Sequence, residues 1–120
     1  MGERERLKVL DAAQQFGVLV VELTKSFRRG APSGLRSQLV AAAMAVSGLL
    51  AEGFGRKSVA EIIHYSHMAN GSLEECQNYL RECVNLRLID KKTFYRAWNL
   101  SVATSKMLIA LIETYERKSG

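Results

Sequence analysis

The sequence predicts an all-α protein that folds as an up-down-up-down antiparallel four-helix bundle. Four stretches of the chain carry apolar residues at the spacing of an α-helix, and no stretch shows the sustained alternation of a strand. Short segments with glycine or proline separate them, and short loops make consecutive helices antiparallel neighbours. The 120 residues, 48% of them hydrophobic, can bury one core, so residues 1–120 are expected to form a single domain.

The first two predicted helices are separated by the clearest loop signal in the chain. The first helix covers about residues 5–28 and ends at residues 29–34, which contain Pro32, the only proline. The second helix covers about residues 35–54. It is apolar nearly all round, which is typical of a central or interface helix, so we expect it to be the most buried of the four.

The third predicted helix begins at Ser58 and ends near residues 85–88, and the fourth covers about residues 91–116. Ser58 and Glu61 have the spacing of a capping box, in which each side chain accepts a hydrogen bond from a free N–H of the first turn.

Apolar residues at helical spacing indicate which face of each helix turns inward. On the first helix we expect the inner face to include Leu7 and Phe16. On the fourth we expect it to include Trp98, Ile109 and Ile112.

Two cysteines, Cys76 and Cys83, lie seven residues apart on the third helix. This spacing places them about 10 Å apart along the helix axis. A disulfide requires Cα atoms within about 7 Å of each other. We therefore expect two buried free thiols, as in a reducing cytoplasm.

The remaining composition points to a cytoplasmic protein with no membrane partner. Residues 1–8 are charged throughout, unlike a signal peptide, and the longest apolar runs, residues 18–21 and 39–46, are too short to span a bilayer. The net charge of +5 makes an acidic partner plausible but does not identify one.

Two short motifs lie on the second and third helices. Residues 50–58 read L-A-E-G-F-G-R-K-S and are followed by Glu61, and residues 69–75 read A-N-G-S-L-E-E. Together they resemble the pattern I-A-E-G-x-G-R-x-S-x-x-E, then A-x-G-S-x-x-E, of the four-helix-bundle family of 23S rRNA intervening-sequence proteins. That family includes the accessory variability proteins of diversity-generating retroelements. The residues of the motif are Glu52, Gly53, Gly55, Arg56, Ser58, Glu61, Gly71, Ser72 and Glu75.

The resemblance implies a four-helix bundle that assembles into a ring-shaped homopentamer and has no known catalytic activity. For the retroelement branch it implies binding to a reverse transcriptase and to nucleic acid. The chain departs from the family on the second helix, where Val40 and Ala41 replace basic residues and residues 47–49 replace Pro-x-Asn. These departures weaken the case for a basic surface on that helix and are compatible with tight subunit packing.

The motif has a structural and a functional interpretation, of which we favour the structural one. Glu52 and Arg56 are spaced for an ion pair if the helix continues past Gly53 and Gly55. Such a pair either ties the following turn or marks a partner or ligand site. We expect the two glycines to supply a C-cap and close packing, and Gly71 to lie where another helix or another subunit comes close.

No metal site, cofactor site or catalytic site is predicted. His64 and His67 are three residues apart, and Glu61 with His64 forms one Glu-x-x-His motif. Di-iron bundles need that motif on two helices and a further Glu on each of the other two. No serine has a plausible His and Asp arrangement. The sequence therefore indicates a protein that is not an enzyme.

Basic residues gather at one end of the predicted bundle, because the first and third loops share that end. Seven basic residues against Asp90 give this end a net charge of +6, which would repeat around the axis of a cyclic oligomer and attract phosphates. The alternative is ordinary solvated loop charge. Only Phe94 and Tyr95 are aromatic there, so base stacking is not indicated. The seven residues are Arg28, Arg29, Arg36, Arg87, Lys91, Lys92 and Arg96.

Two function hypotheses follow. The first is a homo-oligomeric accessory protein that binds RNA or DNA phosphates, and a reverse transcriptase, through this basic surface, with Arg28, Arg29, Lys91 and Lys92 as the leading contacts. The alternative is a structural or protein-interaction module that does not bind nucleic acid.

Overall fold

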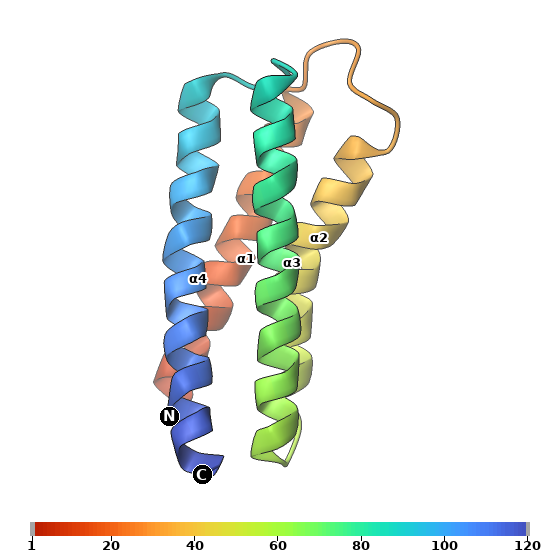
Figure 1. The fold of residues 1–120 in the computed structure, drawn as a ribbon. Coiled ribbons are helices and arrows are strands. Elements are labelled where there is room, and N and C mark those ends of the chain that lie inside the picture. Colours follow the sequence, from red (N-terminus) through yellow and green to blue (C-terminus); the bar gives the residue numbers. More distant parts are fainter. Residues whose placement is uncertain (1, 120) are drawn as a thin grey trace.

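Four α-helices form the protein in the computed structural model, which describes residues 2–119 (Figure 1). They are α1 (Glu3–Lys25), α2 (Leu35–Phe54), α3 (Val59–Asn85) and α4 (Lys91–Ser119). α1 and α3 each pack against both α2 and α4, so consecutive helices are antiparallel neighbours around one core. The bundle measures 50 × 23 × 19 Å. The predicted all-α, up-down-up-down fold is confirmed.

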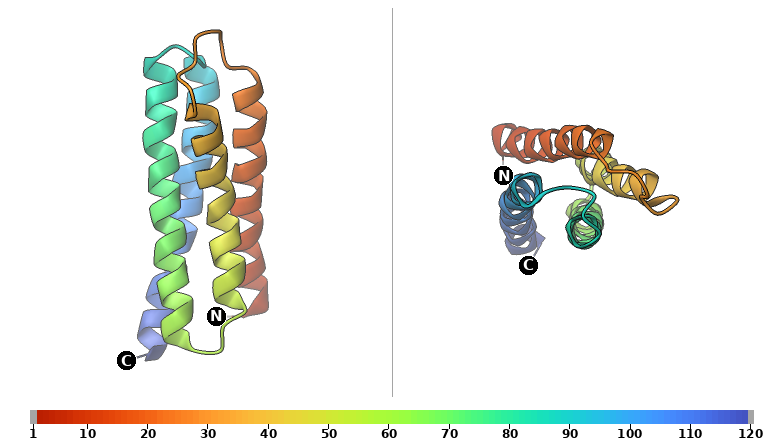
Figure 2. Two further views of the ribbon diagram at one scale, coloured as in Figure 1. Left: turned by 90° about the vertical axis from the view of Figure 1, so that its right-hand side faces the viewer. Right: turned by 90° about the horizontal axis from the view of Figure 1, so that it is seen from above.

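The α1–α2 and α3–α4 loops lie at one end of the bundle, which we call the loop end. The short α2–α3 turn and both chain termini lie at the other (Figure 1). A backbone hydrogen bond from the Arg28 N–H to the Leu88 carbonyl, 3.4 Å long, joins the two loops directly. Seen from above, α1 and α2 are inclined, whereas α3 and α4 are viewed more nearly end-on (Figure 2).

The predicted helix bounds agree with the structure to within three residues. α2 has the predicted bounds, and α4 continues beyond the predicted end to Ser119. α1 ends at Lys25 rather than near residue 28, because Ser26 closes the last turn with bonds from its N–H and its hydroxyl to the Leu23 carbonyl. The following residues are then free to approach the α3–α4 loop.

Ser58 caps the start of α3, as predicted. Its hydroxyl oxygen accepts the Glu61 N–H at 3.1 Å, which satisfies one of the free donors of the first turn. The second half of the predicted box differs, because the Glu61 carboxylate accepts from the Ser58 hydroxyl at 3.3 Å rather than from the Ser58 backbone N–H.

The core receives seven buried residues from each helix. Phe16 is fully buried at its centre. Leu7, predicted on the same face, is 56% exposed, because nine residues of α-helix turn it to the opposite side from Phe16. The prediction that Ile109 lies on the inner face of α4 is also wrong. Ile109 is 46% exposed, because it lies about 100° around the helix from the buried Leu108.

α2 has the highest share of buried residues, seven of 20, which agrees with the prediction. By length and composition alone it could cross a membrane, with a mean hydropathy of 1.3. Core helices of bundles also meet those criteria, and the buried residues of α2 pack against α1 and α3. Its outer face is different, since Ala41, Met44, Gly48 and Ala51 are all exposed.

Cys76 and Cys83 are free thiols buried in the core, as predicted. Burial raises the pKa of Cys76 to about 12 and that of Cys83 to about 11, with smaller contributions from Glu75 and Glu82 respectively. Both side chains therefore stay protonated at neutral pH and act as small apolar core residues.

Candidate nucleic-acid interface

The seven basic residues predicted at one end come together at the loop end. The α1–α2 loop and the first turn of α2 supply three of them, and the α3–α4 loop and the first turns of α4 supply the other four. All seven side chains are exposed. We call this surface the basic end, and it consists of Arg28, Arg29, Arg36, Arg87, Lys91, Lys92 and Arg96.

The charges of the basic end are not neutralised by ion pairs. Within residues 2–119, both ion pairs closer than 4.0 Å belong to Arg56, which lies at the opposite end of the bundle. The guanidinium of Arg36 instead lies over the ring of Phe27, 5.5 Å from its centroid, which anchors that side chain without removing its charge.

Asp90, the carboxylate predicted to offset this charge, serves as a helix cap. Its Oδ1 accepts the Thr93 N–H at 2.8 Å, at the start of α4. Hydrogen bonds from the Thr93 hydroxyl and N–H lower the pKa of Asp90, and the nearby positive charges of Arg28 and Lys92 lower it further. Asp90 is therefore ionised at neutral pH, and its carboxylate lies more than 4.0 Å from the charged nitrogens of the seven basic side chains.

The structure adds two charged residues that the sequence analysis missed. Lys25 lies in the last turn of α1, and Glu22 lines a groove between α1 and α4 together with Lys92 and Arg96. One charge is positive and the other negative, so the net charge of this end remains +6. Both residues lie within the last turn and a half of α1, so helical spacing counted back from Ser26 places them at the loop end.

Arg87 occupies a left-handed backbone conformation, with φ of 59°. It follows the end of α3 in a Schellman motif, in which the Leu88 N–H bonds the Cys83 carbonyl and the Arg87 N–H bonds the Val84 carbonyl. Glycine is the usual residue at this position, because a Cβ atom makes the conformation costly. A charged residue thus stands where backbone energetics favour glycine.

Replacing Arg87 with glycine is expected to raise the free energy of unfolding by about 1 kcal/mol, because the strain at the left-handed position is relieved. Urea denaturation followed by circular dichroism measures this change. Arg29→Gly is the matched control, since Arg29 lies in the other loop without a positive φ and should gain no stability. A loss of stability in Arg87→Gly would contradict the strain argument.

The motif residues near the α2–α3 turn form a second cluster, at the opposite end of the bundle. The Nη2 of Arg56 donates to Glu52 and, at 2.9 Å, to the Tyr65 hydroxyl, while its Nη1 lies 3.5 Å from Glu61. The guanidinium also lies 5.0 Å from the centre of the Tyr65 ring. The hydrogen bond to Glu52 is the main reason that the pKa of Arg56 is raised. Arg56 thus links both helices, which favours the structural interpretation.

The two glycines of this motif have different roles. A Cβ atom on Gly53 would lie 2.7 Å from the Cβ of Tyr65, so close packing of α2 on α3 requires glycine there, as predicted. Gly55 is the C-cap of α2, but its φ of −80° is open to any residue. The predicted C-cap is therefore confirmed at Gly55, without the left-handed conformation that favours glycine at a helix end.

The second half of the motif lies farther along α3. The prediction that another helix comes close to Gly71 is wrong for this chain, because no atom of residues 2–119 beyond its own helix turn lies within 4 Å of a Cβ atom placed there. The alternative, contact with another subunit, stays a prediction. Ser72 is half-buried, and Glu75 is exposed. Burial, followed by the charges of Glu75 and Glu82, raises the pKa of Tyr79.

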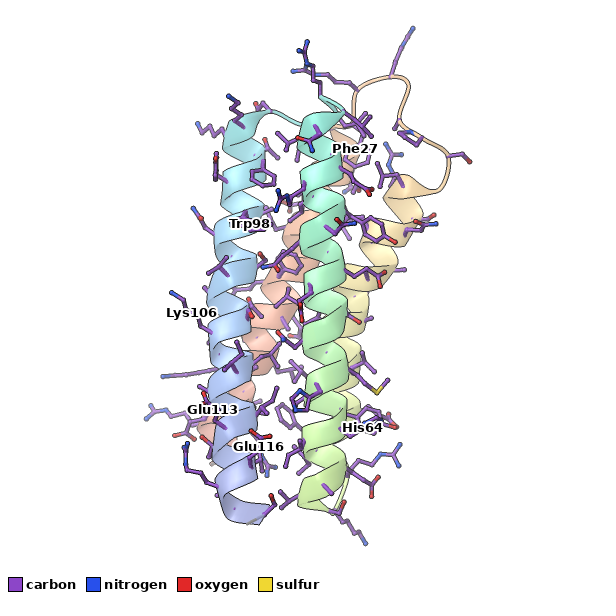
Figure 3. The ribbon with its side chains drawn as sticks, in the orientation of Figure 1. Phe27, His64, Trp98, Lys106, Glu113 and Glu116 are labelled. Atoms are coloured by element: carbon purple, nitrogen blue, oxygen red, sulfur yellow. The ribbon has the colours of Figure 1, made fainter. Side chains whose placement is uncertain are left out.

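His64 and His67 are both exposed on α3. Figure 3 shows His64 near the α2–α3 turn, far along the bundle from Trp98. Among residues 2–119, no three His, Cys, Asp or Glu side chains are grouped so as to hold a metal ion.

Comparison with known proteins gives one family and one fold. A family model described as "23S rRNA-intervening sequence protein" matches residues 5–110. The crystal structure of a protein of unknown function from the S23 ribosomal protein family of Bacteroides thetaiotaomicron has a similar fold, with a TM-score of 0.84 and 20% sequence identity. The match covers 91% of this chain and 98% of that one. No curated protein matches the chain.

Proposed function

This chain belongs to the family of 23S rRNA-intervening sequence proteins, and we propose that it is a non-enzymatic, homo-oligomeric protein that binds nucleic acid phosphates through its basic end. The observation that carries the proposal is the set of seven exposed basic side chains at one end, none of which has a carboxylate of residues 2–119 within 4.0 Å. Multivalent contacts of this kind bind a phosphate backbone by releasing its counterions, and no chemistry on the nucleic acid is needed.

The outer face of α2 supports self-association. No charged residue occurs between Arg36 and Glu52, and Met44 on this face is 53% exposed. An exposed apolar face of this kind is typical of a surface that another protein covers. In a cyclic assembly, the basic end of each subunit would repeat around the axis and multiply the number of phosphate contacts. The family resemblance adds the homopentamer as the expected size.

The same resemblance adds a reverse transcriptase as a second candidate partner, through the retroelement branch of the family. We expect the protein to act in the cytoplasm, where both the partner and the nucleic acid would be accessible. If the apolar face of α2 is the whole of the functional surface, the protein is instead an interaction module that does not bind nucleic acid.

Binding of RNA and DNA across a salt series tests the proposal. Fluorescence anisotropy should give an affinity that falls linearly with salt on logarithmic axes, because each phosphate contact releases counterions. Changing Arg28, Arg29, Lys91 and Lys92 together to glutamate should weaken binding by more than about tenfold at physiological salt. Light scattering should show the same particle mass for the variant and the wild type.

Asp90→Asn is the matched control. Asparagine caps a helix about as well as aspartate, but the change removes the negative charge from the basic end. This variant should bind nucleic acid more tightly than the wild type. Binding that is absent, or insensitive to all these changes, would overturn the proposal and favour the interaction module.

A further inference from the structure

An aromatic pocket opens between α3 and α4 beside the basic end. It has a volume of about 330 Å³ and is lined by Arg81, Val84, Asn85, Phe94, Tyr95 and Trp98. Figure 3 shows Trp98 on the half of α4 nearer the loop end. In the sequence, only Phe94 and Tyr95 are aromatic among the basic residues, which argues against base stacking. The fold adds Trp98, one turn farther along α4, and Arg81 from the facing helix.

The three rings form a fixed aromatic surface. Phe94 and Trp98 are stacked, with centroids 5.5 Å apart and planes 23° apart. Tyr95 meets Phe94 edge to face at 5.1 Å and is itself 56% exposed. Within residues 2–119, neither the Tyr95 hydroxyl nor the Trp98 indole N–H has a hydrogen-bond partner among the side-chain bonds. The residues that line the pocket therefore combine aromatic rings with two polar groups that make no side-chain hydrogen bond.

One basic residue lines the pocket, and a second shares a helix face with its rings. Arg81 lines the pocket, and no carboxylate in the described part of the chain lies within 4.0 Å of it. The neighbouring Glu82 carboxylate accepts from the Asn78 side chain at 3.4 Å. On α4, Lys91 lies four residues before Tyr95, so the two share a face of the helix. A ligand in the pocket would thus meet the cation of Arg81, with Lys91 on the same face of α4 as Tyr95.

We infer that this pocket holds an unpaired base of a single-stranded nucleic acid. The inference rests on the proposed function and deepens it by naming the form of nucleic acid bound. A ligand that suits the pocket has a planar ring to stack on the aromatic side chains and an anionic group to meet Arg81. A nucleotide within a strand meets both requirements. A duplex does not, because its bases are stacked inside it.

Asn85 adds a polar group at the edge of the pocket. Its amide offers two donors and an acceptor, which suits the edge of a base. Stacking itself tolerates any base, because every base has an aromatic face. The pocket is therefore expected to prefer single strands over duplexes and to discriminate only weakly between sequences.

Trp98 is the only tryptophan of the chain, so its fluorescence reports on the pocket alone. The probes are oligouridylate, oligothymidylate and a blunt RNA duplex of equal length, with anisotropy of labelled strands giving the affinity for each. The two single strands should quench Trp98, and the duplex should not. Tyr95→Ala should weaken single-strand binding by about tenfold and leave duplex binding unchanged.

Two control variants test whether the effect of Tyr95→Ala is due to the loss of the aromatic ring. Tyr95→Phe retains the aromatic surface and should bind single strands like the wild type. Ile109→Ala removes another exposed apolar side chain from α4, at a site that does not line the pocket, and should have no effect. Circular dichroism should show the same helix content in each variant.

The outcomes separate this inference from the proposed function. Equal affinity for single strands and duplex, with Trp98 unquenched and Tyr95→Ala unaffected, would overturn the pocket and leave the basic end as the binding surface. Flat anisotropy with every probe would overturn both.

Discussion

Phe16→Ala is expected to lower the free energy of unfolding by about 3–5 kcal/mol, the typical cost of removing a buried phenylalanine ring. Phe16 is 0% exposed and is among the largest fully buried side chains of the bundle. Its removal would leave a cavity that the rigid packing of four long helices cannot fully close. Because a domain of this size is stable by about 5–15 kcal/mol, the loss would be a large share of the total.

Leu7→Ala is the matched control for this prediction. Both residues belong to α1 and both are apolar, but Leu7 is 56% exposed, so its truncation should change stability by less than about 0.5 kcal/mol. Urea denaturation of the two variants measures the contrast. Similar losses in both would mean that Leu7 is covered by another copy of the chain, which the particle mass would then reveal.

Gly53→Ala is expected to lower the free energy of unfolding by about 1–3 kcal/mol, as overpacking in a core does. The added Cβ would lie 2.7 Å from the Tyr65 Cβ, and neither atom can rotate away, because each is fixed to its own backbone. The helices would have to separate at this point. The hydrogen bond from Arg56 to the Tyr65 hydroxyl would be disturbed at the same time.

Gly71→Ala provides a comparison of opposite sign. Gly71 lies in the middle of α3 with open space around it, so alanine should stabilise the helix by about 1 kcal/mol through its higher helix propensity. Thermal denaturation of the two variants should therefore shift the melting temperature in opposite directions. Destabilisation by Gly71→Ala, with a smaller particle mass, would instead show that a second subunit approaches this glycine.

These variants also mark how far the sequence determines the fold. The helix bounds, the Ser58 cap and the meeting of two loops at one end all follow from local signals and from the antiparallel rule for short connections. Such features depend on residues close together in the chain. Residue type alone predicts Leu7 on the inner face of α1, whereas its rotation relative to Phe16 places it on the exposed face.

The candidate surfaces depend on how the helices pack against one another, which the sequence alone does not predict. Gly53 and Gly71 are the same residue in similar motifs, but only the angle between α2 and α3 determines that Tyr65 lies against the first and nothing against the second. The pocket between Arg81 and Trp98 likewise depends on the register of α3 against α4. That register is set by packing along both helices, which no local motif encodes.

The position of the two chain termini has a practical consequence. Both lie at the end of the bundle that carries the α2–α3 turn, across the 50 Å long axis from the basic end (Figure 1). An affinity tag or a fluorescent protein fused to either terminus would be kept away from the phosphate-binding surface. Immobilisation through such a tag would present every basic end toward the solution, which is the geometry that a surface-based binding assay requires.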